Sequence, residues 1–361
     1  MKKILVIIMA VYLFGFSLFA WVKPADAFSD TERRALKQFP DLSVQTILKG
    51  SFMSNFESYA LEQFPLRDTF RSIKSAVARY VMQQSDINDL YLEDGYIVSM
   101  EYPLSTNSLE YAAGRFQNVY EMYLKDSDTN IYFSIIPDKN YFLAAESGHL
   151  SMDYERFVEE MAGKVSFMKY IDIMNELTIE DYYKTDTHWN QTGIKDVANA
   201  LANGMGTSLN NELHKVILEN PFYGVYYGQF ALPVAPDEIS YLTNDILEQC
   251  IVFDHQNNKE IPMYDMEKAA GKDPYEMFLG GPLSLVTVEN PNATSGKELI
   301  LFRDSFGSSI APLLVEGYEK ITLVDIRYIQ PAMLEKFVTF EDQDVLFLYS
   351  TSVLNSSNTI K

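Results

Sequence analysis

Two short segments, far apart in the sequence, carry residue types that together could activate a serine. Asp186 and His188 stand two residues apart in the first segment, and Ser305 stands in the second. Side chains two residues apart in an extended segment point the same way. The carboxylate can then hold the Nδ1–H tautomer of the imidazole and leave Nε2 as a base. A capping turn with a surface histidine remains an alternative for the first segment.

The surroundings of Ser305 are those of a nucleophile at the end of a strand. A strand is predicted over Glu298–Arg303 and a helix over Ser308–Gly317, with Ser305 in the turn between them. Sites in parallel sheets gather at the carboxyl ends of strands, and a helix N-terminus can stabilise an oxyanion. Gly307 would let the backbone pass close to a substrate. The alternative is that Ser305 or Ser308 only caps the helix.

The composition narrows the function classes. The formal net charge is −21, which disfavours nucleic acid as a partner. Cys250 is the single cysteine, so an internal disulfide is excluded. The four histidines are scattered, and the sequence shows no cysteine and histidine cluster at metal-ligand spacing. We therefore expect neither a metal nor another cofactor.

The amino terminus predicts a membrane anchor. Residues 4–22 are uncharged and follow two lysines, and as a helix they would span about 28 Å, close to the thickness of the hydrocarbon layer. The lysines stay on the cytoplasmic side, so the rest of the chain is expected outside. The alternative is a signal peptide cleaved after Ala27, giving a secreted protein.

The order of predicted elements indicates an α/β protein in several parts. Apolar strand-like runs alternate with helical periodicity on both sides of a segment rich in Tyr, Gly, Asn and Pro, which we interpret as a β-rich insertion. One predicted helix runs from Asn190 to Ala202. The predicted divisions are an anchor, a helical region with a hairpin, the first α/β part, the insertion and the second α/β part: 1–22, 23–103, 104–203, 204–296 and 297–361.

The two segments together resemble a known family of exported bacterial proteins. Asp186-x-His188-Trp189, followed downstream by Asp304-Ser305-Phe306, resembles the DHHW family, which looks like a branch of the SGNH hydrolases and is similar to periplasmic alginate O-acetyltransferases. The order of the two motifs is that of the family. Thr187 stands where the family often has a second histidine.

The resemblance implies a fold and an activity. The fold is a Rossmann-like SGNH-hydrolase fold with a β-rich insertion, an N-terminal helical region and an anchor helix. Ser305, His188 and Asp186 would form a catalytic triad that moves acetyl groups from a membrane-bound O-acyltransferase to a cell-surface polysaccharide. The alternatives are a carbohydrate O-acetylesterase and a non-catalytic scaffold of envelope assembly.

Further residues are candidates for the oxyanion hole or for binding substrate. Two glycines and an asparagine within the insertion match the family's oxyanion blocks only weakly, and several basic or aromatic residues follow predicted strands. These candidates are Gly307, Gly280, Gly281, Asn290, Arg327, Tyr328 and Lys139.

Overall fold

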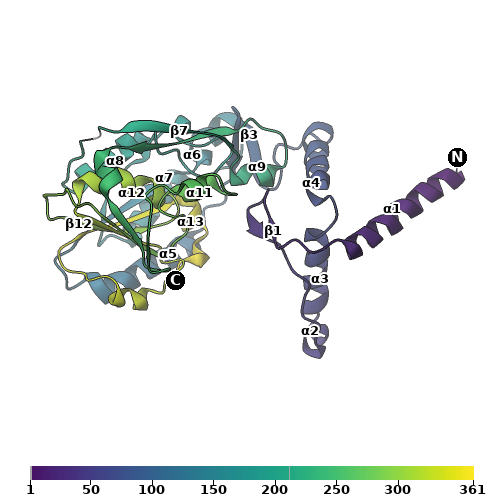
Figure 1. Cartoon of the computed structure of the whole chain (residues 1–361), viewed down its shortest axis with the longest axis horizontal. Helices are drawn as coiled ribbons and strands as arrows, with labels where there is room; N and C mark the ends of the chain where they lie inside the picture. Colours follow the sequence, from purple (N-terminus) through teal and green to yellow (C-terminus); the bar gives the residue numbers. More distant parts are fainter. Residues whose placement is uncertain (1, 211) are drawn as a thin grey trace. The chain divides into compact units, whose positions relative to one another are not determined.

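The computed structural model describes residues 2–210 and 212–361, and these form two compact units. The first unit comprises Met1–Leu90 and Val225–Val234, and the second comprises Tyr91–Gly224 and Ala235–Lys361. Figure 1 shows the elements of both along the chain. Each unit is described by itself.

The second unit is built on an eight-stranded sheet with the order β10-β9-β11-β13-β12-β14-β5-β6. The strands from β13 to β6 pair in parallel, whereas β11, β9 and β10 join antiparallel. Their bounds are β5 Asn130–Ile136, β6 Lys169–Tyr170, β9 Ile251–Asp254, β10 Lys259–Ile261, β11 Leu285–Glu289, β12 Glu298–Arg303, β13 Lys320–Val324 and β14 Asp344–Ser350.

The central strands are apolar on both faces because helices cover both sides of the sheet. In β12, Leu299 and Leu301 join one buried cluster, and Ile300 and Phe302 join the other. The first cluster includes residues of α8 (Lys195–Gly204) and α12 (Gly307–Leu314), and the second includes residues of α5 (Thr106–Val119), α7 (Tyr154–Lys164) and α13 (Thr351–Asn355). Such near-continuous apolar runs are typical of parallel strands.

Shorter elements complete the second unit. Two small hairpins are β3 Leu90–Glu93 with β4 Tyr96–Ser99, and β7 His214–Phe222 with β8 Asp237–Thr243. The remaining helical segments are η2 Tyr120–Leu124, α6 Lys139–Ser147, η3 Met174–Glu176, η4 Ile179–Asp181, α10 Asp245–Gln249, α11 Met266–Ala269, η5 Pro274–Met277, η6 Val315–Gly317, η7 Pro331–Lys336 and η8 Ser357–Thr359.

The predicted fold class is confirmed, with one refinement of the β-rich segment. Only β7 and β8 stand apart there as a separate two-stranded sheet. Strands β9, β10 and β11 extend the main sheet, with β11 pairing antiparallel to β13. The exact division of the chain into the five predicted parts stays a prediction.

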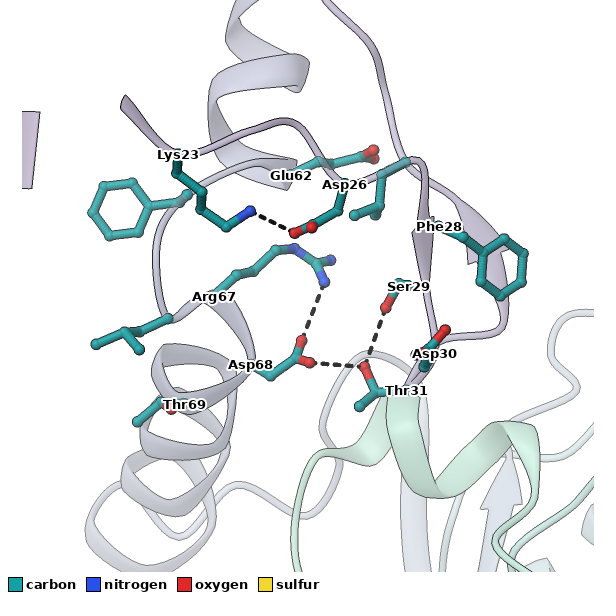
Figure 2. Close-up of a pocket in the computed structure, with 13 residues that line it drawn as sticks. Lys23, Asp26, Phe28, Ser29, Asp30, Thr31, Glu62, Arg67, Asp68 and Thr69 are labelled. Carbon is teal, nitrogen blue, oxygen red and sulfur yellow. Dashed lines mark hydrogen bonds and ion pairs between the residues drawn. The ribbon is translucent and has the colours of Figure 1, made fainter. Parts of the chain in front are cut away.

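The first unit consists of helices and one small strand pair. Its elements are α1 Lys2–Val22, β1 Phe28–Ser29, β2 Arg34–Ala35, α2 Val44–Leu48, α3 Ser51–Glu62, α4 Arg67–Ala76, η1 Val77–Val81 and α9 Val225–Phe230. Helix α1 is long and apolar enough to cross a membrane. A polar cavity of about 370 Å³ lies where the segment after α1 meets α3 and α4, and Figure 2 shows Arg67, Asp68 and Thr31 around it.

Candidate active site

The structure brings the two segments together as a continuous chain of polar contacts. The Oγ atom of Ser305 lies 2.7 Å from Nε2 of His188. On the other side of the ring, Nδ1 lies 2.6 Å from Oδ1 of Asp186. That carboxylate also accepts a hydrogen bond of 3.1 Å from the main-chain N–H of His188, and it is buried. A nucleophile, a base and a group that orients the base are thus in hydrogen-bonding sequence.

The loop that carries Asp186 and His188 is held from two directions. Asp237, at the start of β8, accepts hydrogen bonds from the main-chain N–H groups of Lys184 and Thr185 at 2.7 and 2.8 Å. Lys139, after β5, donates to the carbonyl oxygens of Tyr183 and Lys184 at 2.9 and 3.1 Å. These contacts fix the path of this short segment, and with it the direction of the Asp186 and His188 side chains.

A tyrosine from the β-rich segment forms a wall against the imidazole. The ring of Tyr275 stacks on that of His188, with centroids 3.8 Å apart and planes 9° apart. Its hydroxyl lies 2.8 Å from Oγ of Ser309 in α12, and burial raises the pKa of this phenol above its ordinary value. A neutral, buried ring on one face of His188 keeps water away from that face and limits rotation of the imidazole.

Trp189, the last residue of the Asp186-x-His188-Trp189 motif, contacts α12 and the serine turn. Its Nε1–H donates a hydrogen bond of 2.8 Å to Oγ of Ser309, and its ring packs edge-on against Phe306. Tyr275, rather than Trp189, stacks on the imidazole. Ser309 therefore links Trp189 and Tyr275, and ties both segments to the first turns of α12.

The turn that presents Ser305 is braced by its neighbour Asp304. One carboxylate oxygen accepts from the main-chain N–H of Phe306 at 3.0 Å, and the other accepts from that of Ser350 at 2.8 Å. The first contact closes the turn, and the second joins it to the end of β14. The serine is thus held at the carboxyl edge of the parallel strands, where sites of such sheets form.

Arg303, directly before this turn, is fully buried beneath it. Its guanidinium donates to the carbonyl oxygens of Asp304 and Leu283, each at 3.3 Å, and lies 3.7 Å from the carboxylate of Asp325. Burial lowers the pKa of Arg303, and the carboxylate of Asp325 offsets part of that effect. A buried positive charge under the serine turn has a structural partner and several hydrogen bonds, as such charges require.

Gly307 is required by packing against the strand. A side chain at this position would bring its Cβ atom to 2.5 Å from Cβ of Arg303, closer than real side chains approach. The N–H groups of Gly307 and Ser308 donate to the carbonyl oxygens of Asp304 and Ser305 at 3.1 and 3.2 Å. The first turn of α12 thus uses these donors internally, and the role of Gly307 in substrate approach stays a prediction.

The basic and aromatic candidates lie at the same edge of the sheet with distinct surroundings. Burial lowers the pKa of Lys139 to about 7, because the charged ammonium loses its water. Arg327 makes a two-pronged contact with Asp325, at 2.9 and 2.7 Å, so its charge is already partnered. Tyr328 is half exposed beside Arg327.

The predicted oxyanion candidates Gly280, Gly281 and Asn290 lie at two different edges of the sheet. Gly280 and Gly281 precede β11 at the edge that carries Ser305, but the N–H of Gly281 already donates to the carbonyl of Phe278 at 3.1 Å. Asn290 follows β11, which runs antiparallel to β13, so it lies at the opposite edge and its side chain donates to the carbonyl of Val315. The expectation of Asn290 near the serine is therefore wrong.

Sequence reasoning missed two residues that shape the site, Tyr275 and Asp237. Both stand in the segment interpreted as an insertion, without a motif around them. The signal available was weak: a tyrosine after Asp273-Pro274 and an acidic residue after Pro236. Within the described parts of the chain, no group of three or more His, Cys, Asp or Glu residues could hold a metal ion.

A family model and several solved structures are similar to this chain. The sequence profile described as DHHW protein matches residues 145–324. A DHHW family protein from Eubacterium siraeum is 20% identical with a TM-score of 0.58, covering 76% of this chain and 94% of that one. PatB1 of Bacillus cereus with a sulfonyl adduct is 18% identical with a TM-score of 0.59, covering 74% of this chain and 97% of that one.

These likenesses agree with the resemblance predicted from the sequence. No curated protein sequence matches the chain. At their low identity, the two solved structures establish the fold alone. The profile match adds the family pattern around Asp186 and His188 and up to the serine turn. The chain is thus similar to the DHHW family over the stretch that holds Ser305, His188 and Asp186.

Proposed function

We propose that this protein is a serine-dependent O-acyltransferase that works through an acyl-enzyme on Ser305. The observation that carries the proposal is the unbroken contact chain from Ser305 Oγ through His188 to Asp186, at 2.7 and 2.6 Å. A serine hydroxyl is a weak nucleophile until a base removes its proton, and this arrangement supplies that base and its orienting carboxylate.

In the first half-reaction the hydroxyl of Ser305 attacks the carbonyl carbon of a donor ester. Nε2 of His188 takes the serine proton as the new C–O bond forms, and Asp186 stabilises the resulting imidazolium. The tetrahedral intermediate collapses, the ester bond to the donor breaks, and His188 returns the proton to the departing oxygen. The acyl group is then bound to Ser305 Oγ.

In the second half-reaction an acceptor hydroxyl attacks the acyl-enzyme. His188 takes the hydroxyl proton, the acyl group moves to the acceptor oxygen, and the proton returns to Ser305. The stacked ring of Tyr275 holds the imidazole in one orientation through both halves. Water entering in place of the acceptor would give hydrolysis, so the same residues serve an esterase.

The proposed substrates follow from the family resemblance. The acyl group is acetyl, delivered by a membrane-bound O-acyltransferase, and the acceptor is a cell-surface polysaccharide. Helix α1 would anchor the chain with its catalytic unit on the extracytoplasmic side, in agreement with the two lysines that precede the apolar run.

Turnover with an acyl donor and an acceptor tests this proposal. Purified protein is incubated with p-nitrophenyl acetate and oligosaccharides, and the products are read by mass spectrometry. Acetylated oligosaccharide that disappears with Ser305→Ala supports the transferase. Free acetate as the only acyl product, with the same dependence on Ser305, would make the protein an esterase. If Ser305→Ala releases p-nitrophenol as fast as the wild type, the acyl-enzyme proposal is overturned. A non-catalytic scaffold would give this result.

A further inference from the structure

The first unit has its polar and apolar residues in the reverse of the usual arrangement. Glu32 accepts contacts from Arg67, Arg71 and Arg34 inside the unit, and Thr31 donates to Asp68. Figure 2 shows Thr31, Asp68 and Arg67 of this polar region, between α4 and the segment that follows α1. Large apolar side chains meanwhile lie on the outside.

Some of the outward apolar residues form a stripe along α4 and η1. Phe70, Ile73, Val77 and Tyr80 follow one another at spacings of three and four, which places them on one face of α4 and η1, and Leu66 precedes them as the N-cap residue of α4. We call these five residues the α4 stripe. Ile73 is 53% exposed and Tyr80 is 71% exposed, whereas Ser75 and Ala78 on the opposite face are buried.

The stripe is continuous with the helix that can span a membrane. Phe70 packs edge-on against Phe16 of α1, with ring centroids 5.8 Å apart. Phe64 stacks on the same Phe16 ring at 5.7 Å and also contacts Phe70 at 5.6 Å. The beginning of α4 is therefore fixed to the side of α1.

The position of Phe16 sets the depth of this contact. It stands six residues before Val22, the end of α1, and six residues of helix span about 9 Å. Amphipathic helices that lie in the membrane interface bury their apolar face about 5–10 Å below the surface. Phe64 and Phe70 contact α1 at that depth, which water does not reach in a spanning helix.

We infer that α4 and η1 lie flat in the outer leaflet of the bilayer, with the α4 stripe against the acyl chains. The inference takes from the proposed function that α1 is a retained anchor. Arg67, Arg71 and Lys74 lie off the stripe, so their charges can stay at the level of the headgroups or within the unit's polar interior. The catalytic unit would thereby be tethered by an embedded surface as well as by one helix.

Lipid quenching of site-specific fluorophores tests this inference in the full chain. Cys250 is replaced by serine, and single cysteines are placed at Val77 or Ile73 on the stripe, or at Ser72 as an exposed control on the same helix. Each variant is labelled with bimane and reconstituted in phosphatidylcholine nanodiscs, some carrying a nitroxide near the headgroup end of the acyl chain. We expect at least twofold quenching at the two stripe positions and background quenching at Ser72.

A label at Phe14 in α1 separates failure of the anchor from failure of this inference. Quenching at Phe14 by a nitroxide deep in the acyl chain, without quenching at Val77 and Ile73, would overturn the embedded stripe and leave the anchor in place. Absent quenching at Phe14 would overturn both. Stripe labels shielded from aqueous iodide but not quenched by lipid would show that a second copy of the chain covers the stripe, and would also overturn the inference.

Discussion

The two units of this protein place their apolar residues in opposite ways. In the second unit, strands such as β12 and β14 bury every apolar side chain, and polar residues gather at strand ends in a connected network. In the first unit, arginines and carboxylates contact one another inside while the α4 stripe faces outward. The difference fits the proposed placement of the first unit, because acyl chains, unlike water, favour apolar side chains on the surface.

The comparison also separates two uses of polar contacts. Around Ser305, hydrogen bonds fix the direction of three side chains: Ser305 and His188, which would exchange a proton, and Asp186, which orients His188. In the first unit, ion pairs around Glu32 hold α4 with its polar side inward. Disrupting the network around Ser305 should therefore affect chemistry, and transferring the first unit to a different solvent should affect α4 and its stripe.

The largest effect is expected from removing the nucleophile. Ser305→Ala should lower kcat/KM for p-nitrophenyl acetate by at least about 10³-fold, since activated serine and its base act as a unit. Ser308→Ala, in the first turn of α12, is the matched control, and its kcat/KM should stay within a few-fold of that of the wild type. Similar losses in both variants, with normal folding, would favour a helix-capping role for this segment.

A second, smaller loss is expected from Asp186→Asn. The amide keeps the shape of the side chain but can stabilise the wrong tautomer of His188, so kcat should fall by about 10²–10⁴-fold. Steady-state kinetics on the folded variant would measure it. Activity within threefold of the wild type would show that the 2.6 Å contact has no catalytic role.

Two matched substitutions compare the interiors of the units directly. Val345 is fully buried in β14, whereas Val77 on the α4 stripe is 42% exposed. Val345→Thr should lower the free energy of unfolding by about 1–3 kcal/mol, because the hydroxyl loses water without a new partner. Val77→Thr should change it by less than about 0.5 kcal/mol. Thermal unfolding in detergent measures both, and equal effects would contradict the reversed arrangement.

Replacing Tyr275, which stacks on His188, should lower kcat moderately. Tyr275→Leu removes an aromatic contact of about 0.5–1.5 kcal/mol, so kcat should fall about two- to tenfold. Tyr275→Phe keeps the ring and removes only the contact with Ser309, and should recover most of the activity. If Tyr275→Phe is as slow as Tyr275→Leu, the hydroxyl rather than the stacking matters.

A further expected effect concerns pH and the buried Lys139. Its pKa falls from 10.5 to about 7 on folding, so between these values the unfolded state binds the extra proton. This group therefore makes the protein more stable as pH rises from about 7 to about 10.5. The stability advantage of the wild type over Lys139→Met should grow across that window. Unfolding midpoints at several pH values measure the difference, and a constant difference would contradict the assignment.

The sequence predicts the parts of this structure that depend on local order. The strand before Ser305, the apolar helix at the amino terminus and the paired Asp186 and His188 are visible as residue types at short spacing. The fold class follows from the alternation of elements. That the two catalytic segments face each other rests on the family resemblance, since no local pattern encodes a contact across more than a hundred residues.

The rest depends on tertiary paths that short patterns do not encode. Tyr275 reaches His188 because the segment before β11 folds back over the sheet edge, and Asn290 moves away because β11 runs antiparallel. The helix predicted from Asn190 begins only at Lys195, because the Asn190 side chain instead closes a turn by accepting from the N–H of Gly193.

Covalent labelling of Ser305 tests the central claim most directly. The protein is treated with phenylmethylsulfonyl fluoride, and its peptides are read by mass spectrometry. An activated Ser305 displaces fluoride and carries the sulfonyl group, whereas Asp186→Asn and His188→Ala should label far more slowly. We predict that the peptide holding Ser305 is modified before any other serine. An unmodified Ser305 in correctly folded protein, or equal labelling in all three variants, would contradict the account.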